Sequence, residues 1–420
     1  MAQQGALSDL RVIDLGHFIA GPYCASLLAG MGAEVIKVER PGTGDAARQM
    51  GPFPNDETHL EKSGLFSYLN LGKKSITLNL KSEAGREAFR RLVVRTDILI
   101  ENFEPRVMSS LGLAYENLSK LSPRLIMTSI SNYGQTGPYR DYKGYEITLN
   151  ALGGVQAEIG EPDREPIKLG GQQLQFQAGL TAAFAAMSAV IYRDKGGTGQ
   201  HIDLAIVEVA AMMKGAPLTY YQFTGYRRVR NGMRPMADSP RDTDRPGLKS
   251  SRSGGALYPI AILPCKDGYV CVDTEATPQW LSLLDMMARP DLKDDTRFRG
   301  GSRRGDNADV VDDILREYLK DKTQRELFEE CTAWRVPLGI VNDMATLFHD
   351  PQHRSRGFFI EVEHPVLGKL EYPGHAFIMN ETPWQVSRAP LLGEHNREIL
   401  IDRLGYSEEE VTQMARDGVI

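Results

Sequence analysis

The stretch LRVIDLGHFIAGPYCASLLAGMGAEVIKVER, residues 10–40, decides the fold of this protein. Its first six residues, 10–15, form a short apolar run that is typical of a strand, and residues 34–40 form a second one. Between them, residues 21–33 carry apolar side chains at helical spacing, and Pro22 lies near the first turn, where its missing N–H group is tolerated. The stretch therefore predicts a β-α-β unit.

The same alternation recurs further along the chain. Residues 75–80 and 97–103 are strand-like, and residues 82–96 between them have helical spacing. Strands that alternate with helices favour an open, Rossmann-like parallel sheet with helices on both faces. Sheets of this α/β class bind their ligands at the carboxyl ends of the strands.

Polar and aromatic residues follow several of the predicted strands. The residues at these strand ends are His17, Arg40, Asn102, Phe103 and Tyr133. Arg40 stands before a turn, which suits contact with a phosphate or carboxylate, although most arginines are solvated surface cations. The first strand–helix junction lacks GxGxxG, so the dinucleotide-binding fingerprint is absent.

The pattern of the sequence changes near residue 225. We expect a large α/β domain in residues 1–225, a smaller α+β domain with its linker in residues 226–335, and a return segment, 336–420, that completes the large domain. The linker is rich in Arg, Pro, Gly and Ser and lacks periodicity, as a linker or functional loop would. Asp267 and Gly268 separate two strand-like runs and predict a hairpin.

Composition excludes several classes of function. The chain has 420 residues and a net charge of −6 with no long run of one sign, so no nucleic-acid partner is expected. No signal peptide and no uninterrupted apolar stretch of membrane-spanning length is evident, so we expect a cytoplasmic protein without a membrane partner. The four cysteines fit reduced thiols. Cys265 and Cys271 are expected to be buried strand residues, since nothing nearby completes a set of four metal ligands.

Seven sequence motifs follow one another along nearly the whole chain. They are HFIAGPYCASLLAGMGAEVIKVERPGTGD, GKKSITLNLK, ILIENFEP, YGQTGPYRDYKGYE, GTGQHIDLAIVE, PLGIVND with DPQHRSRGFF, and APLLGEHNREIL. Each motif alone is weakly specific, but their order and spacing resemble the family III CoA-transferases. This family includes formyl-CoA transferase, carnitine CoA-transferase and, more distantly, α-methylacyl-CoA racemase.

The resemblance implies an architecture and a ligand. It implies an α/β domain built from both ends of the chain, a smaller inserted domain, and two subunits interlinked like chain links. It also implies that CoA or acyl-CoA is bound as a substrate, without a metal. The positions that match CoA-binding residues of the family are Ala20, Arg40, Leu78, Lys81, Asn102, Phe103, Lys143 and Tyr145. The chain departs from the family at Ser110, where an arginine is usual and Arg106 could substitute, and at Ile19, where glutamine is usual.

The family's nucleophile is missing. In the family, an aspartate between a Gly-rich segment and a long helix attacks the donor thioester and forms an anhydride, which is covalent catalysis by a carboxylate. The segment PIKLGGQQLQFQAG, residues 166–179, places Gln175 at that position. An amide keeps the size and hydrogen bonding of a carboxylic acid but lacks the charged oxygen that attacks.

Two further residues bear on catalysis. Glu146 matches a family glutamate close to the active site, and it is either a substitute nucleophile or a carboxylate that orients its neighbours. Tyr145 and Gln175 occupy the places of the histidine and aspartate of the racemase branch, so proton transfer by two bases has no evident base.

These observations predict the non-catalytic subunit of a heteromeric CoA-transferase. Its partner would be a homologous chain that carries the aspartate, and its substrates a CoA thioester such as succinyl-CoA and a carboxylic acid. The alternatives are an acyl-CoA lyase or isomerase that needs no covalent carboxylate, and a CoA-binding regulatory protein without turnover. The aromatic run LTYYQFTGY, residues 218–226, would suit an aromatic acid or, more commonly, form buried core.

Overall fold

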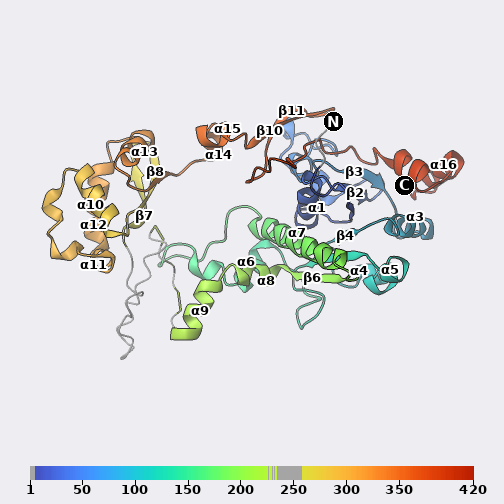
Figure 1. Cartoon of the computed structure of the whole chain (residues 1–420), viewed down its shortest axis with the longest axis horizontal. Coiled ribbons are helices and arrows are strands. Elements are labelled where there is room, and N and C mark those ends of the chain that lie inside the picture. The colour runs from blue at the N-terminus through green and yellow to red at the C-terminus, as the bar shows by residue number, and fades with distance from the viewer. Residues whose placement is uncertain (1–4, 226, 229, 231, 234–257) are drawn as a thin grey trace. The chain divides into compact units, whose positions relative to one another are not determined.

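The computed structural model describes residues 5–225, 227–228, 230, 232–233 and 258–420. Contacts between residues divide the chain into two compact units (Figure 1). The large unit comprises residues 1–153, 170–213 and 351–420, and the small unit comprises residues 154–169 and 214–350. Residues 154–169, 214–225 and 336–350 group with the small unit, whereas the sequence patterns predict them in the large domain, so the return segment begins at Pro351 rather than at residue 336. Most of the predicted linker lies outside the described residues.

The large unit is built on a six-stranded sheet in which every neighbouring pair is parallel. The spatial order of its strands is β3-β2-β1-β4-β5-β6. Their bounds are β1 Arg11–Asp14, β2 Glu34–Glu39, β3 Lys74–Thr77, β4 Ile98–Glu101, β5 Ile126–Ser131 and β6 His201–Ala205. The predicted open parallel sheet is confirmed, and the order reverses between β1 and β4, as in doubly wound folds.

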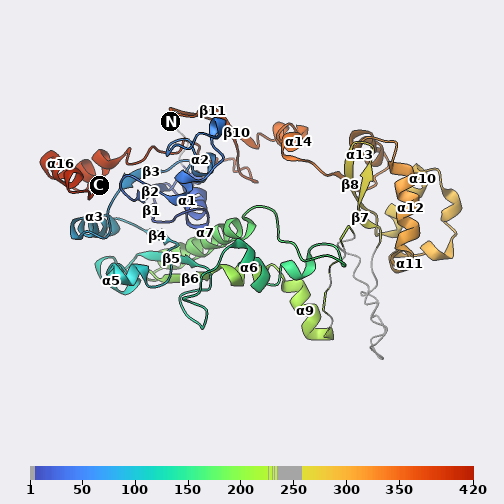
Figure 2. The same cartoon turned by 180° about the vertical axis from the view of Figure 1, so that it is seen from behind.

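The two faces of the sheet bury different side chains. Ile13 and Ile36 point to a hydrophobic core that also contains Phe89 of α3 (Glu83–Val93) and Leu400 of the return segment. Because side chains alternate along a strand, residues such as Asp14 lie on the opposite face. That face is covered by α1 (Ala20–Gly30) and α7 (Gln173–Asp194), which lie side by side in both views (Figures 1 and 2).

Helices α1 and α7 approach each other closely at a glycine. A Cβ atom at Gly179 would lie 2.7 Å from the carbonyl oxygen of Ala20, so no larger residue fits without a shift. By length and composition α7 could also cross a membrane. Half of its apolar window is buried against the rest of the protein, which is the usual position of a core helix.

The remaining elements of the large unit are short, and the chain returns along the edge of the sheet. Backbone N–H of His395 donates to Ser75 O at 2.9 Å, and N–H of Asn79 donates to Val419 O at 2.7 Å. The helical elements are η1 Ala46–Gln49, η2 Pro54–Asp56, α2 Gly64–Leu69, α3 Glu83–Val93, α4 Val107–Ser110, α5 Tyr115–Leu121, α6 Glu146–Leu152, α8 Ile206–Met212, α15 Pro351–Ser355, the π-helical turn η6 Glu398–Arg403 and α16 Glu408–Arg416. The hairpin β10 Phe359–His364 and β11 Gly368–Pro373 is antiparallel.

The small unit is an α+β structure with a three-stranded antiparallel sheet, β7-β8-β9. Its strands are β7 Ile260–Cys265, β8 Gly268–Asp273 and β9 Leu338–Ile340, which confirms the predicted hairpin turn. Its helical elements are η3 Gln156–Glu158, α9 Gly215–Thr224, α10 Thr277–Met286, η4 Pro290–Leu292, η5 Thr296–Phe298, α11 Gly301–Asp306, α12 Ala308–Leu319, α13 Gln324–Ala333 and α14 Met344–Phe348. The buried Trp280 belongs to its hydrophobic core.

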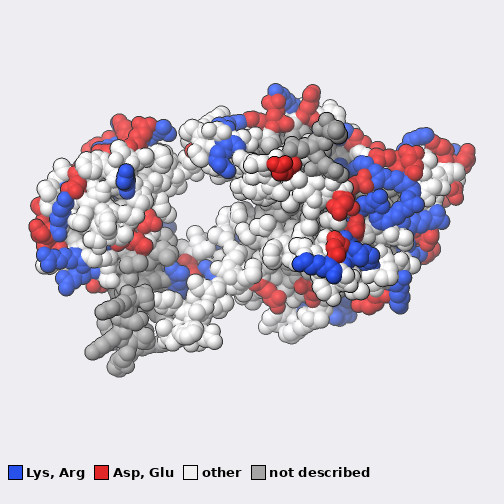
Figure 3. Space-filling model, in the orientation of Figure 1, with Lys and Arg blue, Asp and Glu red and all other residues white. Residues whose placement is uncertain are grey.

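Two expectations about side chains are corrected. The aromatic run on α9 is not buried core within this chain: Leu218, Tyr221 and Phe223 are exposed, and α9 carries no charged residue, as the uncoloured surface in Figure 3 shows. Cys265 and Cys271 are half-buried rather than buried. Cys271 alternates with the buried Val270 and Val272 and so lies on the other face of the sheet, and Cys265 is the last residue of β7.

Candidate functional site

The strand order reverses between β1 and β4, and open α/β sheets bind ligands beyond the carboxyl ends of the strands at such a point. The segments that leave these two strands are fastened together. Backbone N–H of His17 donates to Asn102 Oδ1 at 2.7 Å, and Asn102 Nδ2 donates to the carbonyl oxygen of His17 at 2.8 Å. Both polar atoms of the Asn102 side chain are therefore used to hold the loop after β1.

Buried charged side chains also hold the backbone of this loop. Lys37 Nζ donates to the carbonyl oxygen of Gly16 at 2.8 Å and lies 2.7 Å from Asp45 Oδ2. Asp14 Oδ1 accepts from the N–H of Gly16 at 2.8 Å, and Asp45 Oδ1 accepts from the N–H of Phe18 at 2.9 Å. Lys37, Asp14 and Asp45 are completely buried. Burial acts to raise the pKa of Asp45, but Lys37 and His17 outweigh it and hold that pKa well below its ordinary value.

This buried cluster was missed by the sequence analysis. Its signal is a charged residue inside a strand-like apolar run, Asp14 in LRVIDL and Lys37 in EVIKVER. Charged side chains are rarely fully buried unless they are paired, so such positions point to an internal ion pair.

The predicted phosphate contacts gather at the ends of the next two strands. Arg40 follows β2 and Lys81 follows β3, and both side chains are exposed. Among the residues that the structure describes, neither side chain forms an ion pair or hydrogen bond, so both cations are available to an anion. Leu78 is different, because it packs in the core and its N–H donates to Glu39 O at 2.9 Å.

The other predicted cations are already paired at the surface. Arg106 Nη2 lies 2.5 Å from Asp141 Oδ2, and Lys143 pairs with Glu104. All four side chains are more than half exposed, and pairs of this kind contribute little to stability. A phosphate could therefore replace the carboxylates at little cost.

The start of α7 brings Glu146 and Gln175 to one place. Glu146 is the first residue of α6, and its Oε1 accepts from the N–H of Leu174 at 3.0 Å and from Asn150 Nδ2 at 3.2 Å. Its Oε2 is buried without a hydrogen-bond partner among the described residues. Gln175 follows Leu174 and is 8% exposed, whereas Tyr145 before α6 is 73% exposed.

Gln175 also lies close to the start of α1. It stands one turn before Gly179 on α7, and residues four apart share one face of a helix. Gly179 packs against Ala20, the completely buried first residue of α1, which continues from the loop after β1. The loop after β1 and the start of α7 therefore lie on the same side of the sheet.

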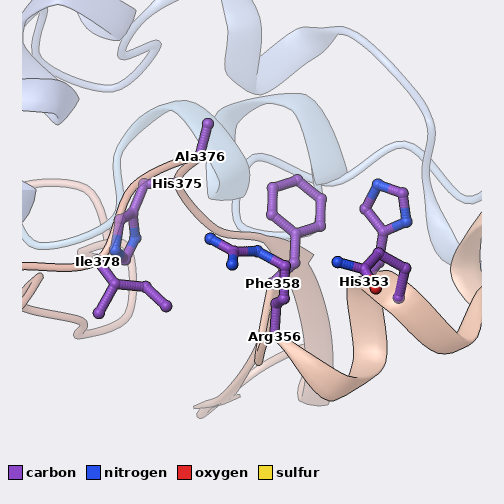
Figure 4. A pocket seen from close by; sticks show the side chains of 7 residues that line it. His353, Arg356, Phe358, His375, Ala376 and Ile378 are labelled. Atoms are coloured by element: carbon purple, nitrogen blue, oxygen red, sulfur yellow. The ribbon is translucent and has the colours of Figure 1, made fainter.

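A further cavity, of about 200 Å³, lies away from these residues in the return segment. His353, Arg356, Phe358 and His375 contribute to its wall, and Figure 4 shows the Arg356 side chain reaching toward His375. The His375 ring stacks on Trp384 at 4.5 Å between centroids, and burial lowers the pKa of His375. None of the predicted CoA-binding residues lines this cavity.

Comparison with known proteins identifies the family. Residues 7–396 match the sequence model of CoA-transferase family III. The chain belongs to CoA-transferase family III. It is 34% identical over 419 residues to succinyl-CoA–D-citramalate CoA-transferase of Chloroflexus aurantiacus, covering 99% of this chain and 98% of the relative. A second relative from that organism, succinyl-CoA–L-malate CoA-transferase beta subunit, is 32% identical over 99% of this chain and 98% of its own length.

The solved structures agree with the family assignment. A CAIB/BAIF family protein from Brucella suis superposes with a TM-score of 0.81 at 32% identity, covering 95% of this chain and all of that structure. CoA thioesters are the substrates of family III CoA-transferases, so the predicted family and ligand class are confirmed. Within the described ranges, no group of three or more His, Cys, Asp or Glu side chains is arranged to hold a metal ion.

Proposed function

We propose that this chain is the non-catalytic subunit of a heteromeric family III CoA-transferase. The observation that carries the proposal is Gln175 at the buried start of α7, where the family places its nucleophilic aspartate. An amide has no charged oxygen with which to open a thioester. The partner is a homologous chain that supplies the aspartate, in an interlinked assembly within the cytoplasm.

Glu146 does not replace the nucleophile in this proposal. One of its carboxylate oxygens already accepts from the N–H of Leu174 and from Asn150. The hydrogen bond holds Oε1 at the start of α7, where the helix dipole stabilises a carboxylate. Its role is to hold the first turn of α7.

Surface chemistry supports a protein partner. Leu180, Phe184 and Ile191 are more than half exposed along α7, and Phe184 is 74% exposed. Large exposed apolar side chains on one element mark protein interaction sites more often than free surface. One relative of this chain is also named as the beta subunit of its enzyme.

In this proposal the chain binds CoA without processing it. Phosphates would contact Arg40 and Lys81, and the loop after β1 would lie against the thioester end. The donor is succinyl-CoA, and the acceptor is an aromatic dicarboxylic acid of the (R)-benzylsuccinate type, as in anaerobic toluene degradation. The relatives named for succinyl-CoA support the donor.

The test compares the chain alone with the chain plus its partner. The purified chain is incubated with succinyl-CoA and (R)-benzylsuccinate, and hydroxylamine or borohydride trapping followed by mass spectrometry looks for covalent adducts. We expect no transfer and no adduct on this chain alone, and transfer with the adduct on the partner's aspartate after co-expression. Transfer by the chain alone, or an adduct on Glu146, would overturn the proposal. Lyase or isomerase products from an acyl-CoA would do the same.

A further inference from the structure

Phe18 has an unusual backbone conformation. Its φ angle is 68°, in the left-handed region that glycine, asparagine and aspartate adopt far more easily than an aromatic residue. Such conformations persist only where the surrounding structure enforces them, and they cluster at ligand-binding sites.

The surroundings of Phe18 do enforce it. Its N–H donates to the buried Asp45 at 2.9 Å. The two residues before it are held through both their N–H and carbonyl groups, His17 by Asn102 and Gly16 by Asp14 and Lys37. The conformation of this loop is therefore fixed before any ligand arrives.

The strained loop lies at the carboxyl end of the parallel sheet. The loop leaves the carboxyl end of β1 at the point where the strand order reverses, and the ring of His17 is 5.6 Å from that of Phe103, which follows β4. Phe18 itself is only half-buried, and it has no ring contact within the described part of the chain. Two residues later the chain enters α1 at Ala20, which packs one turn away from Gln175 on α7.

We propose that Phe18 is a specificity-determining residue that contacts the acyl group of a bound CoA thioester and favours acyl groups with an apolar or aromatic part. This rests on the proposed binding of CoA by this chain. Arg40 and Lys81 mark the phosphate end of the site, and Gln175 marks the end where a thioester lies. An aromatic ring on the loop after β1 adds contact area and ring stacking for an apolar acyl group, and little for a small one. Hydrophobic pockets discriminate by about 10–200-fold for such differences.

The test measures binding of three ligands to the full-length chain by calorimetry: free CoA, acetyl-CoA and phenylacetyl-CoA. Phe18→Ala removes the ring and keeps the strain, whereas Phe18→Gly removes the ring and permits the positive φ angle, so the second variant carries the test where the first folds poorly. Phe328→Ala, which removes an exposed ring on α13 of the small unit, is the matched control.

We expect the wild type to bind phenylacetyl-CoA more tightly than acetyl-CoA. Both Phe18 variants should reduce that preference about fivefold or more and change the affinity for free CoA less than about twofold. The control Phe328→Ala should leave the preference unchanged. An unchanged preference, or an equal loss for all three ligands, would overturn the role of Phe18 while CoA binding stands. Failure of the wild type to bind CoA at all would overturn the proposed function as well.

Discussion

The carboxylate of Glu146 accepts a hydrogen bond from the backbone N–H of Leu174 at 3.0 Å, one residue before Gln175. Helix α7 has no side-chain cap from its own N-cap residue, Gln172. Glu146 supplies that cap from a neighbouring helix, and its negative charge suits the positive end of the α7 dipole. The position of Gln175 therefore depends on Glu146.

Removal of this cap should destabilise the protein. Glu146→Ala leaves the N–H of Leu174 without its acceptor in a buried place, so we expect the free energy of unfolding to fall by about 1–3 kcal/mol. Glu146→Gln keeps an acceptor oxygen and should cost less. Urea denaturation measures both, with the exposed Glu104→Ala as a control that should change little. Equal stability of Glu146→Ala and the wild type would contradict the capping role.

A carboxylate at position 175 should give the single chain some CoA-transferase activity. Gln175→Asp places a carboxylate at the family position, and we expect weak CoA transfer by the single chain, with a trappable acyl adduct on the new side chain. Gln175→Asn is the matched control, since it has the size of aspartate without the charge. Normal CoA binding with no transfer in Gln175→Asp would mean that other parts of the site, such as Ile19 and Ser110, no longer support catalysis.

CoA affinity should depend on the cations at the ends of β2 and β3. Hydrogen bonds from a charged group to phosphate contribute roughly 1.5–3 kcal/mol, so Arg40→Ala should weaken CoA binding about tenfold or more. Lys81→Ala should act in the same direction. Arg124 precedes β5, at the amino end of the sheet, and Arg124→Ala is the control. Calorimetry that finds equal affinities for Arg40→Ala and Arg124→Ala would remove Arg40 from the site.

Stability should fall as pH rises toward neutrality because of Glu101. Burial raises the pKa of Glu101 from 4.5 to about 7, although Ser129 and the N–H of Phe103 favour the charged form. Between these values the unfolded chain has lost the proton that the folded protein still holds, so folding becomes less favourable with rising pH, by up to about 3 kcal/mol.

The comparison of wild type with Glu101→Gln isolates this effect, because other titrations cancel. The stability difference between the two should shift against the wild type from about pH 5 to about pH 7 and then remain constant. A difference that does not depend on pH over this range would show that Glu101 titrates normally in the folded protein.

The close contact of α1 with α7 should make any larger residue at position 179 destabilising. Alanine normally favours a helix over glycine by about 1 kcal/mol, but a Cβ atom at Gly179 would meet the backbone of Ala20 at 2.7 Å. We expect Gly179→Ala to cost about 1–3 kcal/mol, as overpacking usually does. Gly215, at the start of α9, has open space around its position, so Gly215→Ala should be neutral or stabilising. Thermal unfolding compares the two variants.

Much of the fold was predictable because it rests on local patterns. The strand-like runs and helical spacing in residues 10–40 and 75–103 gave the β-α-β units, since apolar periodicity reports which side of each element is buried. The Asp267–Gly268 turn was predictable for the same reason, because the turn residues themselves favour the hairpin.

The open parallel sheet and the membership among the CoA-transferases could be predicted from sequence patterns alone, and the same patterns predict Gln175 at the place of the family nucleophile. How the site is held became apparent only from the folded structure. The clamp of Asn102 on His17, the burial of Lys37 with Asp14 and Asp45, and the cap of Glu146 on α7 all join residues far apart in the chain. No local pattern encodes such pairs, because their energies depend on which side chains the folded sheet brings within hydrogen-bonding distance.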